Sequence, residues 1–480
     1  MLTILPKSGD LSNVSNYRGI TLLETSYKIV AKIIHGRLLP IADKLDQESQ
    51  CGFRPGRSCA DAIFTVRLAT KKRKEHGLET WILFLDLVKA FDRVPRELLW
   101  SVLHKFGVPP KMIRLLTSLH TNVTINFEVA GINQSMPYTI GVKQGDNLGP
   151  LLFLFYIAAM LITWKATTTT QPCIFKSAQD FKISGRNHST QGELFIFRDS
   201  AYADDTAAAF TSREDASIGT NEIIQHFGRF GMEVHTGQGI KTSKSEILFI
   251  PKASHLYSDP QTHNNTDVTP IQCPNSTFVP VVDKFKYLGS HQAANATESL
   301  DIKERIKAAS NAFGALRKCF FKNRNIALAA KSAIYKCLIL HVALYASESW
   351  SMSANDERIL ATFHNSCVRM ICRVSRQQQR AQYITTDRLL RRLKLPPIAH
   401  FCLKKQLRWA GHVARMPWQR LPRKLLTAWV NRPRSHGAPG NTYAKSLHKN
   451  LSRARISTRR WHILAQDKDE WRAAINNIQC

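Results

Sequence analysis

Two adjacent acids, Asp204 and Asp205, constrain this chain more than any other feature of its sequence. They follow Tyr202-Ala203 and lie between two apolar runs, Leu194 to Phe197 and Ala207 to Phe210. An apolar run, a polar tip and a second apolar run indicate a β-hairpin. Burying neighbouring carboxylates is costly unless a cation neutralises them. Mg²⁺ does so in proteins with one or two carboxylates and substrate phosphates. A solvated turn is the alternative, and the upstream sequence decides between the two.

The charge balance favours a polyanionic partner. The 480 residues include 67 Lys and Arg against 36 Asp and Glu, a net charge of +31. A chain of this length is long enough for two to four domains. Its hydrophobic content of 44% excludes a disordered polyelectrolyte. The last 90 residues carry 20 basic and 3 acidic side chains. Nucleic acid is the usual partner of such a surface.

The sequence has no secretory signal, and its ten cysteines follow no regular pattern. We therefore expect free thiols and an intracellular location, in the nucleus, the cytoplasm or both. Leu148 to Trp164 is uncharged, but it is at the short limit for crossing a bilayer. We expect a buried core helix there and no membrane partner. His364, Cys367 and Cys372 lie in a helical pattern, which favours packing over zinc binding.

Three segments upstream of the two acids have features of a ligand site. Trp81 to Asp86 is a nearly continuous apolar strand that ends in an acid, as expected for a strand buried on both faces. Arg54 and Arg57 lie on a Gly- and Pro-rich loop, and their guanidinium groups suit phosphate oxygens. The loop from Gly141 to Pro150 opens the apolar helix, and its glycines allow the backbone to approach a flat ligand.

The remaining pattern predicts further elements. Helices are expected over 24–39, with an apolar stripe of Ile29, Ile33, Ile34 and Leu38, and over 61–74, where Lys71 to Lys74 should form a solvated end. Other expected elements are loops over 165–192 and 251–276, a second hairpin from 278–282 and 285–289, and helices over 303–319, 325–346, 354–373 and 385–411.

Asp86 and the Asp204-Asp205 pair together suggest a metal-dependent reaction. Acids at a strand end and on a hairpin can hold two Mg²⁺ ions about 3.5–4 Å apart, the arrangement used for in-line phosphoryl transfer. One ion would activate a 3′-hydroxyl, and the other would neutralise a triphosphate and its leaving group.

Seven motifs, taken in order, resemble a reverse transcriptase, and most closely the non-LTR (LINE-type) retrotransposon branch. They are Asn16-Tyr17-Arg18-Gly19-Ile20, Gly52-Phe53-Arg54, Phe84 to Asp92, Lys143-Gln144-Gly145-Asp146, Tyr202-Ala203-Asp204-Asp205, Lys244 and Phe285-Lys286-Tyr287-Leu288-Gly289. The resemblance covers about residues 4–290 and continues more weakly to the segment 407–416. Asn147 and Gly149 depart from it, because they stand where the family pattern has Pro and Ser.

The resemblance implies roles for individual residues. Asp86, Asp204 and Asp205 would bind the metal, with Mg²⁺ as the two ions and Mn²⁺ as a possible substitute. Phe91 would reject ribonucleotides by abutting the sugar 2′ position, so that the product is DNA. The other implied roles are nucleotide contacts from Arg54, Leu87, Gln144 and Gly145, assistance to the leaving pyrophosphate from Lys244, and a primer grip formed by Phe285, Lys286, Tyr287, Leu288 and Gly289.

We expect an α+β right-hand polymerase fold. The expected domains are N-terminally truncated fingers over 1–80, a palm with an antiparallel sheet over 81–295, finger elements at 105–140 inside the palm, a loop insertion at 165–192, a helical thumb over 296–380 and a basic helical nucleic-acid-binding extension over 381–480. Trp409, Trp418 and Trp429 are candidates for stacking on single-stranded bases, although packing is the expectation for at least half of them.

The expected activity is RNA-directed DNA synthesis from dNTPs on an RNA template with a DNA primer, which passes through an RNA–DNA hybrid. No endonuclease is recognisable, so we expect a fragment or a decayed copy of a retrotransposon protein. The alternatives are a catalytically inactive nucleic-acid-binding remnant and a group II intron-type maturase. The sequence does not specify an oligomeric state.

Overall fold

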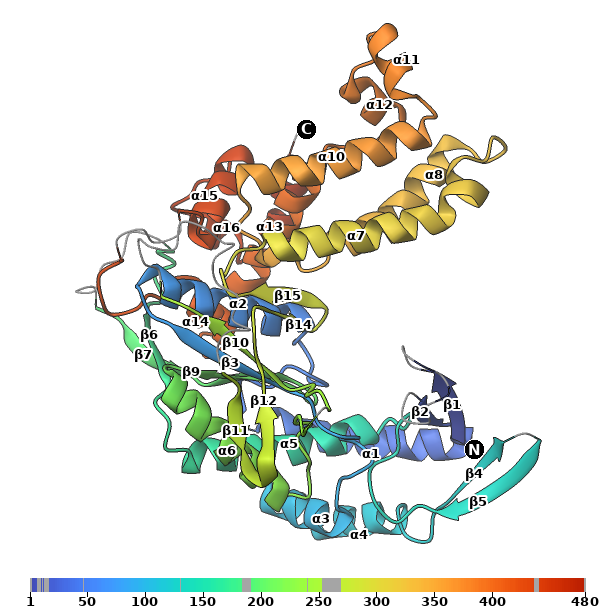
Figure 1. Ribbon diagram of the computed structural model, residues 1–480, viewed down its shortest axis with the longest axis vertical. Coiled ribbons are helices and arrows are strands. Elements are labelled where there is room, and N and C mark those ends of the chain that lie inside the picture. Colours follow the sequence, from blue (N-terminus) through green and yellow to red (C-terminus); the bar gives the residue numbers. More distant parts are fainter. Residues whose placement is uncertain are drawn as a thin grey trace.

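The computed structural model describes residues 2–6, 10, 12, 17–45, 47–129, 131–183, 191–239, 241–252, 269–435 and 440–478. Within these ranges the chain is a mixture of helices and strands built around one central sheet, as expected for the α+β class (Figure 1).

Strands and helices are interspersed up to residue 316, and the regular elements described beyond that residue are helices. Up to residue 210 the elements are β1 (Leu2–Pro6), β2 (Tyr17–Thr21), α1 (Thr25–Asp43), α2 (Cys59–Glu75), β3 (Thr80–Leu85), α3 (Arg96–Lys105), α4 (Pro110–Ser118), β4 (Thr124–Val129), β5 (Ile132–Pro137), α5 (Gly149–Thr167), β6 (Cys173–Ser177), β7 (Glu193–Phe197), β8 (Asp199–Tyr202) and β9 (Asp205–Phe210). From residue 211 to 316 they are α6 (Arg213–Arg229), β10 (Glu246–Ile250), β11 (Ile271–Cys273), β12 (Thr277–Val279), β13 (Val281–Val282), β14 (Lys284–Tyr287), β15 (Ser290–Ala293) and α7 (Ser299–Leu316). The later elements are α8 (Leu328–Ile334), α9 (Leu340–Ala343), α10 (Ala354–Ile371), α11 (Arg376–Ala381), α12 (Thr386–Arg392), α13 (Ile398–Ala414), α14 (Leu421–Thr427), α15 (Tyr443–Arg453), α16 (Trp461–Leu464) and α17 (Lys468–Asn476).

The central sheet has five strands in the order β13-β10-β3-β9-β8. Its neighbouring strands are antiparallel except β10 and β13, which run parallel. Along β3 the side chains alternate between two hydrophobic cores. Trp81, Leu83 and Leu85 belong to one core, and Ile82 and Phe84 belong to the other. Because both faces of this strand are covered, its sequence is apolar without alternation.

Helices cover both faces of the sheet (Figure 1). The first face shares a core with α1, α3, α5 and α6, and the second face packs against α2. Helix α5 is long and apolar enough to cross a membrane by length and composition, but 72% of its most apolar window is buried inside the protein. It is the core helix that the sequence predicts.

Helix α2 lies between the sheet and the C-terminal helices. Its Phe64 ring packs edge-on against Trp409 and Tyr443, which joins the C-terminal helices to the same core. The predicted solvated end of this helix is wrong, because Lys71 and Arg73 are buried. Their charges are bonded inside the protein, Lys71 to a carboxylate and Arg73 to a hydroxyl and a carbonyl.

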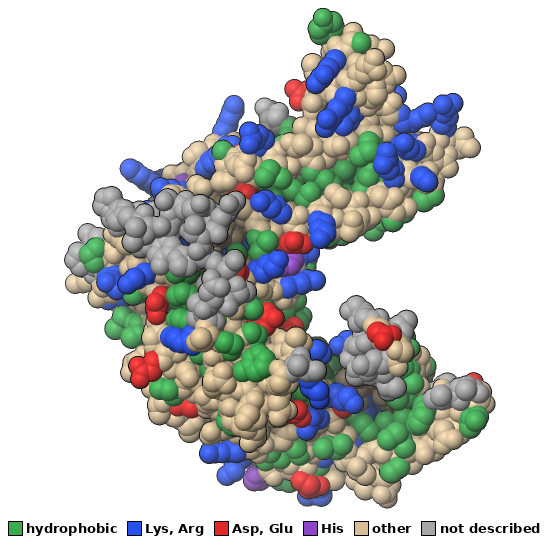
Figure 2. Space-filling view, viewed as in Figure 1, with side chains coloured by type: hydrophobic (Ala, Val, Ile, Leu, Met, Phe, Trp, Pro, Cys, Tyr) green, Lys and Arg blue, Asp and Glu red, His purple; other side chains and the backbone are tan. Residues whose placement is uncertain are grey.

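The molecule has an open C shape (Figure 1). Helices α7, α8 and α10 form one arm, and helices α1, α3 and α4 with two hairpins form the other. Figure 2 shows a hollow between the arms, with Lys and Arg side chains on both sides of it. We call the two arms and the sheet between them thumb, fingers and palm, after the expected right-hand fold, and the bounds of these domains stay predictions.

Several strand partners differ from the predictions. The strand paired with β9 is β8, whereas the run Leu194 to Phe197 lies in β7 and pairs with β6. Strand β14 pairs with β15 rather than with residues 278–282. Two stretches of apolar residues do not specify their partners, because register depends on the whole sheet.

Two predicted loops contain strands. Residues 173–177 of the expected 165–192 loop form β6, and residues 184–190 of it lie outside the described ranges. In the expected loop over 251–276, residues 253–268 lie outside them too, and β11 pairs with β12.

Two helix predictions also need correction. The stripe on α1 is only half right, because Ile34 and Leu38 are buried while Ile29 and Ile33 are 59% and 54% exposed. The predicted helix over 385–411 is broken into α12 and α13 by Pro396-Pro397. A third hydrophobic core includes residues from Ile302, in the predicted thumb, to Cys402, in the predicted extension.

A buried ion pair attaches the thumb to α2. Asp301, at the start of α7, accepts hydrogen bonds from Arg67 at 3.0 Å, the Ser290 hydroxyl at 2.8 Å and the Trp350 indole at 3.0 Å. Burial by itself raises the pKa of Asp301, but hydrogen bonds from His291 and the Arg67 charge together hold that pKa well below its usual value. The carboxylate therefore stays ionised inside the protein.

We predict that Asp301→Asn lowers the free energy of unfolding by about 3–5 kcal/mol, because Arg67 is left buried without its counter-charge. Chemical denaturation measures the change. The stabilisation should be present above about pH 4, the ordinary pKa of Asp, and should fall as the pH drops through the lowered pKa.

The control is Asp469→Asn, which removes an exposed pair with Arg472 at 3.0 Å and should cost less than about 1 kcal/mol. Equal effects of the two substitutions would show that the buried pair does not hold the thumb.

Candidate active site

The two adjacent acids lie at the tip of the β8–β9 hairpin. Tyr202 pairs with Asp205, so Ala203 and Asp204 form a two-residue turn. Ala203 has a φ of 58°, a conformation that a residue with a Cβ adopts at a cost. Asp204 is half-buried and Asp205 is exposed. The acids therefore lie at a hairpin tip as predicted, although the first strand of the hairpin is β8 and not the run Leu194 to Phe197, and the backbone beside the first acid is strained.

Asp86 is brought to the same edge of the sheet by strand register. Leu85, the last residue of β3, pairs with Thr206 of β9. In an antiparallel pair the next residue of one strand faces the preceding residue of the other, which sets Asp86 across from Asp205. The backbone of Asp86 is held in place by the Ser245 hydroxyl, which accepts from its amide at 3.1 Å, and by the His235 amide, which donates to its carbonyl at 2.8 Å.

The three acids interact electrostatically. Burial raises the pKa of Asp204, and the nearby charge of Asp86 raises it further. Although Asp205 is exposed on one side, loss of solvent and the charges of Asp204 and Asp86 raise its pKa to about 6. Mutual repulsion of this kind is typical of functional sites. Within the described ranges, no cluster of three or more His, Cys, Asp or Glu side chains has the geometry of a ready metal site.

A buried glutamine holds the strained turn. The Gln50 side-chain carbonyl accepts from the amide of Ala203 at 2.9 Å, and its amide donates to the Ala203 carbonyl at 3.1 Å. The same carbonyl accepts from the Gly52 amide at 2.7 Å. Gln50 is fully buried, so these bonds are shielded from water. One side chain thus satisfies both backbone groups of the residue that precedes Asp204.

The segment that carries Gln50 runs along the free edge of β8. The Ala201 amide donates to the Ser49 carbonyl at 2.9 Å, and the Cys51 amide donates to the Ala201 carbonyl at 2.7 Å. A Cβ on Gly52 would lie 2.3 Å from the Ala203 nitrogen. Only glycine permits this approach, which explains the glycine directly after Gln50 and Cys51, the two residues that bond the hairpin.

The Gln-Gly loop packs against β2. The Thr21 amide donates to the Gln144 carbonyl at 2.7 Å, and Gly145 has a φ of 101° and would place a Cβ 2.6 Å from the Thr21 carbonyl oxygen. Gly149, where the resemblance leads us to expect Ser, would place a Cβ 2.3 Å from the Lys143 carbonyl oxygen. The close approach of the backbone at this turn therefore requires glycine at position 149, where the family pattern has Ser.

Three aromatic rings pack against one another near the predicted nucleotide site. Phe91 stacks on Phe153 of α5 with ring centroids 4.4 Å apart, and Phe53 meets Phe91 edge-on at 6.2 Å. Phe53 is 41% exposed with a φ of 57°, so its ring is presented to solvent next to Phe91. Leu87, the residue after Asp86, is buried. The predicted roles of Phe91 and Leu87 stay predictions, but the Phe91 ring is fixed by packing.

The Arg54 side chain is not extended toward a site where a phosphate could bind, because its guanidinium is bonded to the backbone. Its guanidinium donates to the Gln47 carbonyl at 2.6 Å and to the Asp43 carbonyl at 3.3 Å. Lys244 is exposed and immediately precedes Ser245, the residue that bonds the Asp86 backbone. The chain thus brings Lys244 to the end of the sheet where the acids lie.

The predicted primer grip is the β14–β15 hairpin. Its turn residues Leu288 and Gly289 have φ values of 47° and 81°, which suits a two-residue hairpin loop. Phe285 stacks on Phe84 with centroids 4.1 Å apart. The Tyr287 side chain is buried and its hydroxyl donates to the Ser200 carbonyl at 3.0 Å, so it anchors the hairpin and is not free to touch a primer. Lys286 is exposed.

The C-terminal tryptophans are mostly structural. Trp409 and Trp429 are buried at 8% and 4% exposure, which makes them unavailable for stacking on bases. Trp418 is half-buried and its indole donates to Glu193 at 2.6 Å. Gly411 leaves room for Trp471, because a Cβ there would lie 2.0 Å from its indole nitrogen. The segment 407–416, which covers the end of α13 and the two residues after it, therefore serves packing.

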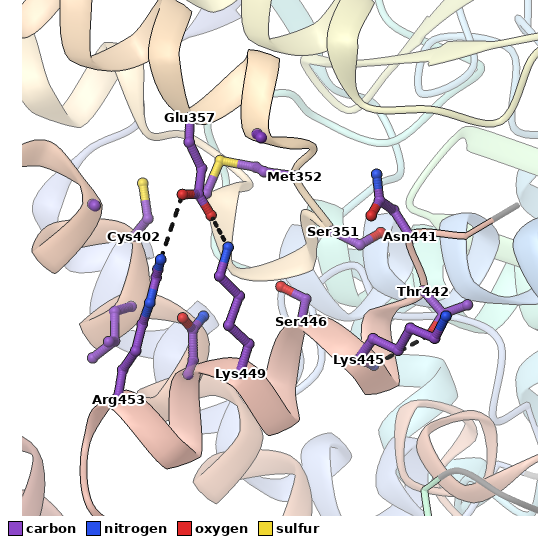
Figure 3. Close-up of a pocket in the computed structure, with 14 residues that line it drawn as sticks. Ser351, Met352, Glu357, Cys402, Asn441, Thr442, Lys445, Ser446, Lys449 and Arg453 are labelled. Atoms are coloured by element: carbon purple, nitrogen blue, oxygen red, sulfur yellow. Dashed lines mark hydrogen bonds and ion pairs between the residues drawn. The ribbon is translucent and has the colours of Figure 1, made fainter.

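Basic side chains of the C-terminal helices also serve packing. Figure 3 shows a cavity between α10, α13 and α15 where Glu357 reaches toward Lys449 and Arg453. Glu357 pairs with Lys449 at 2.7 Å and with Arg453 at 3.6 Å. These pairs join α15 to α10, so part of the basic charge of the tail is neutralised within the domain. His364 likewise bonds Tyr335 at 2.9 Å inside the thumb core.

Two residues near the acids have no role in the sequence-based predictions. Gln50 stands at the start of the basic loop, and no local signal shows that its amide bonds a turn 153 residues away. Arg18 lies on β2, and its charge lowers the pKa of Asp204 against the effects of burial and Asp86. The sequence did contain a signal for a role of Arg18, because this residue belongs to the first of the seven motifs.

The central sheet, the acids at its edge and the helical arms on either side define a right-hand polymerase fold. The model of the reverse transcriptase (RNA-dependent DNA polymerase) family matches residues 5–291, so the chain belongs to that family. The resemblance found from the seven motifs is confirmed.

The relatives come from mobile elements. A 149 kDa protein of transposon TX1 from Xenopus laevis is 33% identical over 34% of this chain and 12% of its own length. The RNA-directed DNA polymerase from mobile element jockey of Drosophila melanogaster is 24% identical over 72% of this chain and 34% of its own. The corresponding protein of transposon X-element is 25% identical over 74% of this chain and 36% of its own length. The last two are non-LTR elements, as predicted, and this chain spans about a third of their length or less.

Among solved structures, telomerase from Candida tropicalis in complex with a fragment of telomeric RNA matches with a TM-score of 0.42 and 11% identity. The match covers the whole of this chain and 64% of that chain.

We predict that Gly52→Ala lowers the free energy of unfolding by about 1–3 kcal/mol, because the new methyl group collides with the backbone of the acid turn. Equilibrium denaturation in urea measures the change.

Gly36→Ala is the matched control. Gly36 lies in α1 with nothing within 4 Å of the position that a methyl group would occupy, so alanine there should be neutral or stabilise the protein by about 0.4–1 kcal/mol. A neutral Gly52→Ala would mean that the loop and the turn do not depend on their close approach.

Proposed function

We propose that this chain is an RNA-directed DNA polymerase of the non-LTR retrotransposon type, which joins a dNTP to the 3′-hydroxyl of a primer. The observation that carries the proposal is the placement of three acids at one sheet edge. Asp86 is set there by the β3–β9 register, and Asp204 and Asp205 by the hairpin turn. Burial raises the pKa values of Asp204 and Asp205, and the charge of Asp86 raises both further, which supports a site where like charges lie close together.

The acids suit hard divalent cations. Carboxylate oxygens are the ligands that Mg²⁺ prefers, and repulsion among uncompensated acids is relieved by a cation. We propose that Asp86, Asp204 and Asp205 hold two Mg²⁺ ions, with Mn²⁺ as a substitute. Bound there, the ions would supply activation of the 3′-hydroxyl and neutralisation of the triphosphate.

The other residues would bind and orient the nucleotide. Gln144 and Gly145 would border the base and template, while the exposed Lys244 would steady the departing pyrophosphate. The Phe91 ring, fixed against Phe153, would meet the sugar where a ribonucleotide carries its 2′-hydroxyl. Arg54 would contact the triphosphate only by turning from the carbonyls that it now binds.

We propose that RNA template, DNA primer and their hybrid bind in the hollow between the arms, where Lys and Arg side chains gather (Figure 2). Such contacts are read by backbone and shape rather than by sequence. An intracellular location, nuclear or cytoplasmic, belongs to the same proposal. It is supported by free thiols at all nine of the cysteines in the described ranges.

We predict that Asp204→Asn reduces primer extension on poly(rA)/oligo(dT) by on the order of 10³-fold or more, because the variant lacks a charge needed for cation binding. The affinity for the template–primer should change little. Extension is measured with dTTP and Mg²⁺, and binding by fluorescence anisotropy.

Asp387→Asn, on the exposed first turn of α12, is the control and should extend normally. Template–primer binding without any extension by the unaltered chain would favour the inactive remnant. Full extension by Asp204→Asn would refute the role of the acids.

We predict that Phe91→Val raises the ratio of rNTP to dNTP incorporation by on the order of 10²-fold, since the smaller side chain leaves room for a 2′-hydroxyl. Single-nucleotide incorporation assays measure both rates.

The matched control is Phe106→Val. Phe106 packs on Phe155 of the same helix that supports Phe91, with centroids 6.0 Å apart. An unchanged ratio in Phe91→Val, with dNTP incorporation intact, would assign sugar selection to another group.

A further inference from the structure

We propose that the C-terminal helical region is part of the polymerase site, and that Arg420 is a positioning residue that holds the loop behind the acid turn. The inference rests on the proposed function, because the effect of Arg420 on the acid turn is measured through the rate of primer extension. It assigns to this basic region a task other than nucleic-acid binding.

Arg420 reaches from the C-terminal region into the loop between α1 and α2. Its guanidinium bonds Glu48 at 3.0 Å, Asp61 at 2.7 Å and the Gly56 carbonyl at 3.3 Å. The amide of the next residue, Leu421, also donates to Glu48 at 3.0 Å. The planar fork of Arg suits several acceptors at fixed angles, which a Lys cannot reproduce.

These contacts hold both ends of the segment that contains Gln50. Glu48 lies two residues before Gln50 and also binds Arg57, at the other side of the loop. Asp61 caps the start of α2 by accepting from the Ser58 amide at 2.9 Å. Residues 48–61 are therefore tied to one arginine at both ends, and Gln50, near the start of the segment, bonds the strained Ala203 beside Asp204.

The region around Arg420 is itself bonded to β6 and to the end of α2. The backbone of Trp429 pairs with Lys176 of β6, with hydrogen bonds of 2.8 and 2.9 Å. Lys72 donates to the Ala428 carbonyl at 2.5 Å, and the His76 ring bonds the Arg432 carbonyl at 2.7 Å. The segment that carries Arg420 is thus held by its own bonds to the rest of the protein, so Arg420 can restrain the position of the loop.

The charge of Arg420 is not available to a phosphate. Its side chain is 12% exposed, and two carboxylates and a carbonyl occupy its donors. A role in nucleic-acid binding would require an exposed and uncompensated cation. The surroundings of Arg420 therefore favour positioning over binding.

The experiment compares Arg420→Gln, Arg420→Lys and the control Arg472→Gln in the full chain. Arg472 is an exposed arginine of the same region that pairs with Asp469, so its substitution removes equal charge without touching the loop. The measured quantities are kcat and KM for dTTP on poly(rA)/oligo(dT), the Kd of the template–primer, and amide hydrogen exchange at Ala203 and Gly52. Melting curves select a temperature at which every variant is folded.

For Arg420→Gln we expect kcat to fall by about 10–100-fold, as small misplacements of reacting groups do, with an unchanged template–primer Kd. Arg420→Lys should be intermediate, and Arg472→Gln should match the unaltered chain. Exchange at Ala203 and Gly52 should accelerate only in the Arg420 variants.

Unchanged kcat and unchanged exchange in Arg420→Gln would overturn the inference, and so would a rise in template–primer Kd alone. If the unaltered chain fails to extend a primer, the proposed function fails. The exchange rates then still decide whether Arg420 holds the turn.

Discussion

The repulsion among three acids at one sheet edge is the constraint on which the rest of this structure depends. Asp204 sits on a turn whose preceding residue has unfavourable backbone angles, and its pKa is raised by burial and by Asp86. An arrangement of this kind persists only where the surroundings over-determine it. Here a sheet packed on both faces and one buried glutamine provide that support. The stability of the palm offsets the cost of holding the acids together.

The net charge of +31 has two uses in this fold. Some basic groups are exposed around the hollow between the arms, where a polyanion can reach them (Figure 2). Others are buried or largely buried and paired: Arg67 with Asp301, Lys71 with Glu298, and Arg420 with Glu48 and Asp61. The paired charges connect the thumb and the C-terminal helices to α2. A count of basic residues therefore overstates the surface available to nucleic acid.

Helix α2 connects the separate parts of the molecule. It packs on the palm sheet, contacts the C-terminal aromatic residues through Phe64, and binds the thumb through Arg67 and Lys71. The loop before it carries Gln50 and the loop glycine that approach the acid turn. The thumb, the C-terminal helices and the loop beside the acid turn therefore share contacts with one helix.

The sequence by itself determined the features that depend on neighbouring residues. The apolar run of β3, the buried helix α5, the acid turn and the ordered motifs of the family can all be recognised from consecutive residues, because periodicity and motif order are local properties. Only the tertiary structure decided that β8 rather than β7 pairs with β9, that Lys71 is buried, that Arg54 binds carbonyls and that Gln50 and Arg420 support the acid turn. Each of these depends on groups brought together from distant parts of the chain, since burial and pairing are set by the partner and not by the residue itself.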